Sequence, residues 1–263
     1  ILLVALFFIP LGQAHVGPHP SVHDTVAGIL NRFKATLPTE EIVSMNLAKA
    51  KSLLTKEERH LLAHEHVSFH VNVPVKVFII RDAAMGDKPF WLKERDFKPL
   101  GLKIKVQNRD VDFWVKDFQP GRVGLGINSI SGNDHPYGVA LMPLKPEPKL
   151  EVTKMYPGQL RTAPMKEGTA PFVDKNEKLP ALPAVLSGLT VVQTVYENRN
   201  DAKLIGIFRR TPYPSSSKPD QVILTWANDP TTSQTIQWRT DDTVDKGQIQ
   251  WVKKADFNRF RPA

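Results

Sequence analysis

The hydrophobic period of this chain changes at His66, and this change constrains the fold more than any other feature of the sequence. Before His66, apolar residues recur every three or four positions, which is the spacing of an amphipathic helix. After it, they recur at every second position, which is the spacing of a strand with one buried face. The alternating residues are Val67, Phe69, Val71, Val73, Val75, Val77 and Ile79. We therefore expect a helical segment over 15–65 and a strand domain over 66–212.

Start signals divide the helical segment into short helices. Apolar residues from Val26 to Leu37 form one stripe, and Thr39 has the character of an N-cap before a second helix. Thr55 and Glu58 have the spacing of a capping box before a third helix. These helices are too short to enclose a large core by themselves, so we expect them to pack against the strand domain.

The strand domain shows no alternation of strands with helices, so a doubly wound parallel sheet is excluded and a mainly β fold, an antiparallel β-sandwich, is predicted. Gly124 and Gly126 lie within a strand pattern, where they indicate close packing or a bulge. The proline-rich stretch from Pro143 to Pro183 is expected to wrap the sandwich as an extended loop. The remaining strand candidates are His66–Ile79, Leu102–Gln107, Val111–Asp117, Val123–Asn128, Tyr137–Leu141, Leu150–Lys154, Thr190–Glu197 and Lys203–Arg209.

The first residues have the character of a targeting signal. The apolar run Ile1–Ile9 is far shorter than the roughly 20 residues that span a bilayer, so no membrane span is expected. Gly12 and Ala14 supply the small residues that a signal peptidase requires. We expect residues 1–14 to be the remnant of a signal peptide whose own start is missing. The mature protein would begin near His15 and be secreted, periplasmic or on the cell surface.

Charge and cysteine content restrict the partners and the chemistry. The chain has 35 Lys and Arg against 27 Asp and Glu, a net charge of +8, and no Cys. Disulfides, thiolate metal sites and cysteine nucleophiles are therefore excluded. The positive charge favours contact with an anionic polymer or an acidic cell envelope. The basic residues are spread over the whole length, however, so we expect no specific nucleic-acid site.

Histidines near the helix–strand junction form the clearest candidate metal site. His60 and His64 would share one helical face, and His66 and His70 would lie on the outward side of the next strand, close to Glu57 and Glu65. A divalent metal site is one interpretation of residues 57–70. Polar residues on solvated surfaces are the other, and we prefer it. The remaining early histidines, His15, His19 and His23, surround prolines and are expected to be exposed.

No complete catalytic motif is present. The adjacent carboxylates Asp110 and Asp112, or Asp241 and Asp242, lack the distant partner that a general acid and base would need. We therefore assign no catalytic, cofactor-binding or metal-binding residue to these 263 positions.

The C-terminal part follows a linker, residues 213–218, and has a strand–turn–strand pattern. Val222, Leu224 and Trp226 alternate along one strand, Asn228–Pro230 turns the chain, and Ile236 and Trp238 alternate along the next. Ile249 and Trp251 suggest a third strand. Large aromatic residues at such positions typically fill the core of a small sandwich.

This segment resembles the fibronectin-type-III-like N-terminal domain of purple acid phosphatases and related metallophosphoesterases. The similarity covers residues 219–263, the first strands of that domain. The residues that match the family pattern are Pro219, Gln221, Val222, Leu224, Thr225, Trp226, Asp229, Pro230, Ser233, Ile236, Trp238 and Thr240.

The resemblance implies an exported phosphoesterase whose catalytic domain lies beyond Ala263 and hydrolyses phosphate esters with two metal ions, iron with zinc, manganese or a second iron. Three segments partly match the family's ligand blocks, but they stand in the wrong order, so no catalytic residue is transferred. They are Ala63–His66, Gly86–Phe90 and Gly132–His135. The alternative is a non-catalytic cell-surface binding or adhesion protein built from serial β-sandwiches.

Overall fold

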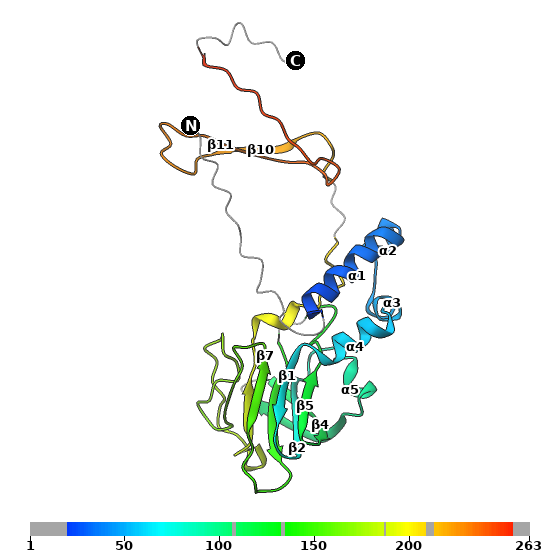
Figure 1. The fold of residues 1–263 in the computed structure, drawn as a ribbon, viewed down its shortest axis with the longest axis vertical. Coiled ribbons are helices and arrows are strands. Elements are labelled where there is room, and N and C mark those ends of the chain that lie inside the picture. The colour runs from blue at the N-terminus through cyan, green and yellow to red at the C-terminus, as the bar shows by residue number, and fades with distance from the viewer. Residues whose placement is uncertain (1–19, 107–108, 133–134, 187, 209–212, 255–263) are drawn as a thin grey trace. The chain divides into compact units, whose positions relative to one another are not determined.

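Antiparallel strands outnumber helices in the protein, as the alternating pattern predicts (Figure 1). The computed structural model describes residues 20–106, 109–132, 135–186, 188–208 and 213–254. The chain divides into two units, residues 1–208 and 209–263. The first unit is a β-sandwich with a short N-terminal helical part, and the second carries a β-hairpin.

Four short helices precede the first strand. They are α1 (Val22–Thr36), α2 (Thr39–Val43), α3 (Leu47–Ser52) and α4 (Lys56–His64). The capping box of Thr55 and Glu58 is confirmed at the start of α4, and Ser21 with Asp24 forms a second one at α1. The prediction that Thr39 is an N-cap is wrong, because Thr39 is the first residue of α2 and Pro38 precedes it. Pro38 lacks a backbone N–H, and at the start of a helix this costs no hydrogen bond within the helix.

The strands of the first unit form two antiparallel sheets. Hydrogen bonding orders the smaller sheet β5-β1-β7 and the larger one β3-β4-β2-β6-β9-β8. The bounds are β1 (Val67–Val71), β2 (Val75–Asp82), β3 (Lys98–Val106), β4 (Arg109–Phe118), β5 (Gly121–Leu125), β6 (Gly138–Pro143), β7 (Val152–Tyr156), β8 (Arg161–Pro164) and β9 (Thr190–Gln193). The other helices are α5 (Trp91–Glu94) and the 3-10 turns η1 (Ala184–Leu186) and η2 (Glu197–Asn200).

The predicted long strand His66–Ile79 is two strands that belong to different sheets. β1 pairs with β5 and β7, whereas β2 pairs with β4 and β6, and the chain changes sheet between Val71 and Val75. Pro74 lies at this corner, where its missing N–H costs no ladder hydrogen bond. The whole alternating apolar series still faces one core, because both strands direct it between the two sheets.

β2 has buried apolar side chains on both faces, so the expectation of a strand with one buried face is wrong for it. Its inner face contributes Val77 and Ile79 to the core between the sheets. Its outer face contributes Phe78, which packs with apolar residues of the proline-rich segment. That segment, expected to wrap the sandwich, covers this outer face and forms β7 and β8 on the way.

The helical part shares a core with the loops that follow β5 and η2. Ile29 and Phe33 of α1 and Leu62 of α4 are fully buried there. They pack with Ile127, Ile130, Ala202 and Leu204. The expected strand Lys203–Arg209 does not form over residues 203–208, because Leu204 and its neighbours cover the helices in an irregular segment; Arg209 lies outside the described residues.

The second unit contains a two-stranded antiparallel hairpin of β10 (Asp220–Thr225) and β11 (Thr235–Arg239). The predicted third strand at Ile249 and Trp251 is wrong, since neither residue lies in a strand. The expectation of a filled core is also wrong here, because Leu224, Trp226 and Trp251 are exposed. Two strands alone offer too little apolar surface to enclose these side chains.

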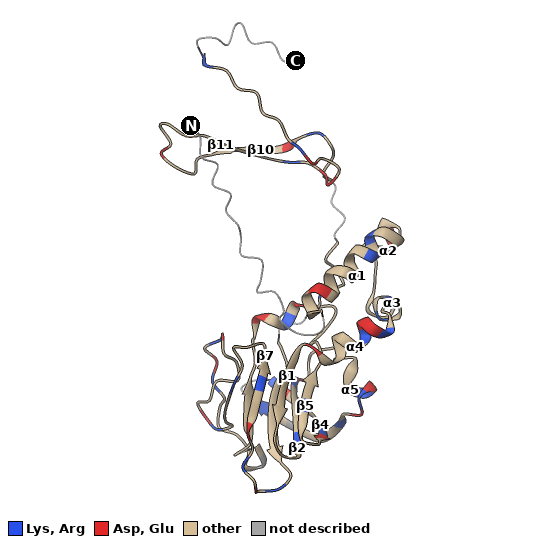
Figure 2. Ribbon diagram, in the orientation of Figure 1, with Lys and Arg blue, Asp and Glu red and all other residues tan. Residues whose placement is uncertain are grey.

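Basic and acidic residues are interspersed along helices and strands (Figure 2). In the part of the chain that the structure describes, none of the helices is long and apolar enough to cross a membrane.

Candidate functional site

The four junction histidines do not form one cluster. His60 and His64 stack on α4 with ring centroids 4.3 Å apart, and Nδ1 of His64 lies 2.9 Å from the carbonyl oxygen of His60. Burial lowers the pKa of His64. His70 lies in β1 opposite Arg122, and His66 is buried. Among the described residues, no group of three or more His, Asp or Glu side chains is placed to hold a metal ion.

Several acidic residues named in the sequence analysis have other partners. The carboxylate of Glu65 accepts a hydrogen bond of 2.5 Å from Arg122. Asp112, from one of the two acidic pairs, accepts one of 2.8 Å from Arg81. Asp241, from the other pair, accepts the N–H of Thr243 in a turn. His15 and His19 lie outside the described residues.

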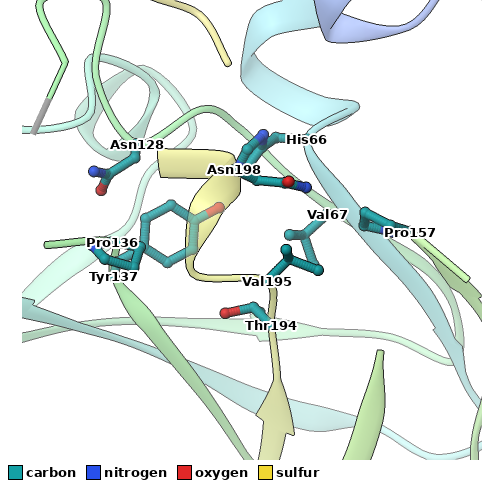
Figure 3. A pocket seen from close by; sticks show the side chains of 9 residues that line it. All are labelled: His66, Val67, Asn128, Pro136, Tyr137, Pro157, Thr194, Val195 and Asn198. Atoms are coloured by element: carbon teal, nitrogen blue, oxygen red, sulfur yellow. The ribbon is translucent and has the colours of Figure 1, made fainter. Parts of the chain in front are cut away.

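His66 instead lines a small cavity together with Tyr137, Thr194 and Asn198 (Figure 3). Burial lowers the pKa of His66 to about 4, so its ring is neutral at pH 7. The hydroxyl of Tyr137 donates a hydrogen bond of 2.5 Å to the carbonyl of Gly126, and burial raises the pKa of Tyr137. The cavity volume is about 10 Å³, the space of one water molecule, so an organic ligand does not fit.

A larger cavity, which we call the outer pocket, lies between the outer face of the larger sheet and the proline-rich segment. Its volume is about 120 Å³. For comparison, an apolar cavity of about 150 Å³ holds one benzene molecule. The residues of its apolar wall are Ile80, Val111, Phe113, Met165, Pro171, Phe172, Leu179, Leu182, Leu186 and Val191.

Backbone hydrogen bonds fix the segment that covers the outer pocket. The N–H of Met165 donates to the carbonyl of Leu189 at 2.6 Å. Within the cover, the N–H of Gly168 donates to the carbonyl of Leu179 at 2.9 Å, and the N–H of Leu179 donates to Thr169 at 2.8 Å. The rings of Phe172 and Tyr196 pack edge to face with centroids 5.2 Å apart. These hydrogen bonds and ring contacts make the covering segment an integral part of the folded first unit.

The charged side chains that line the outer pocket differ in their partners. Arg81 pairs with Asp112, and Glu177 pairs with Lys175 at 3.2 Å. The carboxylate of Asp82 accepts the N–H of Ala84 at 2.9 Å. Arg81 and Glu177 are therefore ion-paired, whereas Asp82 has no cationic partner among the described residues.

Arg109 also lacks a partner of opposite charge among the described residues. Its Nη1 lies 3.2 Å from Nδ1 of His135, and no carboxylate of the described residues pairs with it. A guanidinium can only donate, so Nδ1 of His135 accepts and its other nitrogen carries the proton. Arg109 is partly exposed, so it lies toward the open side of the outer pocket, which we call its mouth, and offers spare N–H donors there. With its apolar interior and few polar groups, this arrangement is suited to binding a small ligand.

Sequence reasoning missed the outer pocket. Arg109, Val111 and Phe113 alternate along β4, which would have placed them on one face. The apolar residues of the cover have no period, so nothing in the sequence indicates that they meet that face.

Comparison with known proteins found no relatives. No family model matches the chain, and no curated protein or solved structure matches it. The resemblance of residues 219–263 therefore rests on the sequence motif alone.

Proposed function

We propose that this chain is the N-terminal, non-catalytic part of an exported metallophosphoesterase of the purple-acid-phosphatase type. The observation that carries the proposal is the β10–β11 hairpin, because several residues of the family motif lie in its two strands. Leu224 of β10 pairs with Ile236 of β11. Asp229, a motif residue, accepts the N–H of Thr231 with its side chain at 2.9 Å and stabilises the turn.

The exposed apolar residues of the hairpin support the same proposal. Leu224 and Trp226 are 62% and 59% exposed, which is unusual for large apolar side chains. In a complete fibronectin-type-III-like sandwich, further strands would cover them. The sandwich of residues 66–208 would then position the catalytic domain or restrict its substrates.

The reaction itself is assigned to residues outside this chain. Phosphate-ester hydrolysis of this type uses two metal ions to generate a hydroxide and to neutralise the phosphate. The described residues do not fit such a centre, because they offer no group of three or more suitable ligands. We therefore derive no catalytic step from this chain.

The test has two parts. The coding sequence downstream of Ala263 should contain the Asp, His and Asn ligand blocks of the family in their usual order. The gene product should hydrolyse p-nitrophenyl phosphate, lose activity on metal chelation and regain it on adding the metal. A downstream sequence without these blocks, or a gene product without phosphatase activity under these conditions, would refute the proposal.

A non-catalytic cell-surface binding protein is the second candidate, and the outer pocket favours it. A protein of this kind needs a ligand site but no reactive groups. Further sandwiches downstream, together with no phosphatase activity, would support this function instead.

A further inference from the structure

We propose that the outer pocket binds a small carboxylic acid whose apolar body is about the size of one ring. The inference goes beyond the proposed function and does not depend on it, because it concerns only the first unit. It rests on three features of the pocket: its volume, its apolar wall and the unneutralised Arg109 at its mouth.

The size of the pocket limits the apolar body. A volume of about 120 Å³ accommodates a phenyl ring or a chain of similar bulk, but not a long acyl chain. Met165 on one wall and Phe172 on the cover offer soft and aromatic surfaces to such a ring. Burial of the ring would provide most of the affinity.

The positive charge of Arg109 determines which head group of the ligand the pocket prefers. Arg109 presents a forked set of N–H donors, which matches the geometry of a carboxylate. The proton-bearing nitrogen of His135 adds a neighbouring donor. An apolar body inside and a carboxylate at the mouth therefore satisfy both parts of the site.

The carboxylate of Asp82 would disfavour an anion at this mouth, and this makes the proposal easier to test. Asp82 pairs directly across β2 and β4 with Val111, two residues from Arg109 on the same face. Its carboxylate would repel the head group but would attract an amine. The preference among acid, alcohol and amine therefore reports which of the two charges dominates the site.

The experiment is calorimetric titration of the 263-residue chain at pH 7 with 3-phenylpropionate, 3-phenylpropan-1-ol and 2-phenylethylamine. We expect the acid to bind about tenfold more tightly than the alcohol, since a charge-assisted hydrogen bond is worth about that factor. An alcohol or amine that binds as tightly as the acid would overturn the proposal. So would the absence of binding by all three compounds.

Variants separate the two parts of the site. Arg109→Gln should remove the preference for the acid but keep the affinity for the alcohol, whereas Arg109→Lys should keep part of that preference. Asp82→Asn should strengthen acid binding. Leu179→Trp should fill the pocket and abolish binding of both compounds. Arg161→Gln is the matched control, because it removes an exposed arginine of β8 that does not line the pocket.

Circular dichroism of each variant would show whether the sandwich is intact. If folded Arg109→Gln kept the full preference for the acid, or folded Leu179→Trp bound as the parent does, the compound would lie elsewhere and the assignment would be wrong. Neither result bears on the phosphatase assay, so the two proposals fail independently.

Discussion

The indole ring of Trp91 occupies the space that a side chain on Gly126 would need. A Cβ atom built on Gly126 would lie 2.5 Å from Nε1 of Trp91 and 2.6 Å from the carbonyl oxygen of Leu62. The same Nε1 donates a hydrogen bond of 2.8 Å to the carbonyl of Ile127. This contact ties α5 to the chain just after β5, at the core that lies between the two sheets.

Gly126→Ala should therefore destabilise the protein. The added methyl group overlaps a buried ring and a backbone oxygen, and such overpacking costs about 1–3 kcal/mol. Thermal unfolding followed by circular dichroism would measure the change. Gly28→Ala is the control, because nothing lies within 4 Å of that position in α1 and alanine favours the helix. An unchanged melting temperature for Gly126→Ala would contradict the packing described.

The sequence predicted the local elements of the fold better than their arrangement. The start of α4 at Thr55 depends on a side chain only three residues away, so the sequence predicts it, whereas the equivalent capping box at Ser21 was not predicted. The close packing expected at Gly126 is confirmed by Trp91. Alternation after His66 predicted the side chains that fill the core between the sheets, but it could not show that the chain changes sheet at Pro74, because both strands face that core.

The environment of the histidines could not be predicted for a related reason. Alternation placed His66 on the outward face, yet it is 8% exposed because the segments after β5 and β9 cover that face of β1. Contacts between segments so far apart in sequence leave no local pattern. The outer pocket could not be predicted for the same reason, because segments far apart in the sequence form it.

Burial of His66 should make stability increase with pH. Its pKa is about 4 in the folded chain against about 6.5 when unfolded, so between these values the unfolded state binds more protons. Stability is then lost as the pH falls from about 6.5 to 4, by at most about 3 kcal/mol. Urea unfolding at several pH values would show this slope, and His66→Gln should flatten it. If the slope of stability against pH were unchanged in His66→Gln, titrating groups other than His66 would be responsible for it.

Asp201 should change the pH dependence of stability in the opposite direction to His66. Burial raises its pKa to about 6 in the folded chain, and His23 opposes this shift. The folded state therefore binds more protons than the unfolded state between about pH 4 and 6, and stability falls as the pH rises through this window. Asp201→Asn should make the protein more stable at pH 7 and leave its stability at pH 4 nearly unchanged. The same urea series would refute this if the variant were less stable at pH 7.

Arg95 should stabilise the junction between α4 and β5. Its Nη1 donates to the carbonyl of Ala63 at 2.6 Å, in the last turn of α4, and to the carbonyl of Gly124 at 2.7 Å. Its guanidinium also lies 5.6 Å from the centroid of the Trp91 ring. Burial lowers the pKa of Arg95 to about 10, so it remains charged at pH 7.

Arg95→Met keeps the apolar stem but leaves both carbonyl groups without this donor, which should cost about 1–3 kcal/mol of unfolding free energy. Arg95→Lys should recover part of the loss, because an ammonium can donate to at least one carbonyl. Arg161→Met, at an exposed position of β8, is the matched control and should change stability by less than about 0.5 kcal/mol. Urea unfolding at pH 7 would compare the three variants. Equal stability of Arg95→Met and Arg161→Met would mean that these hydrogen bonds do not hold α4 to β5.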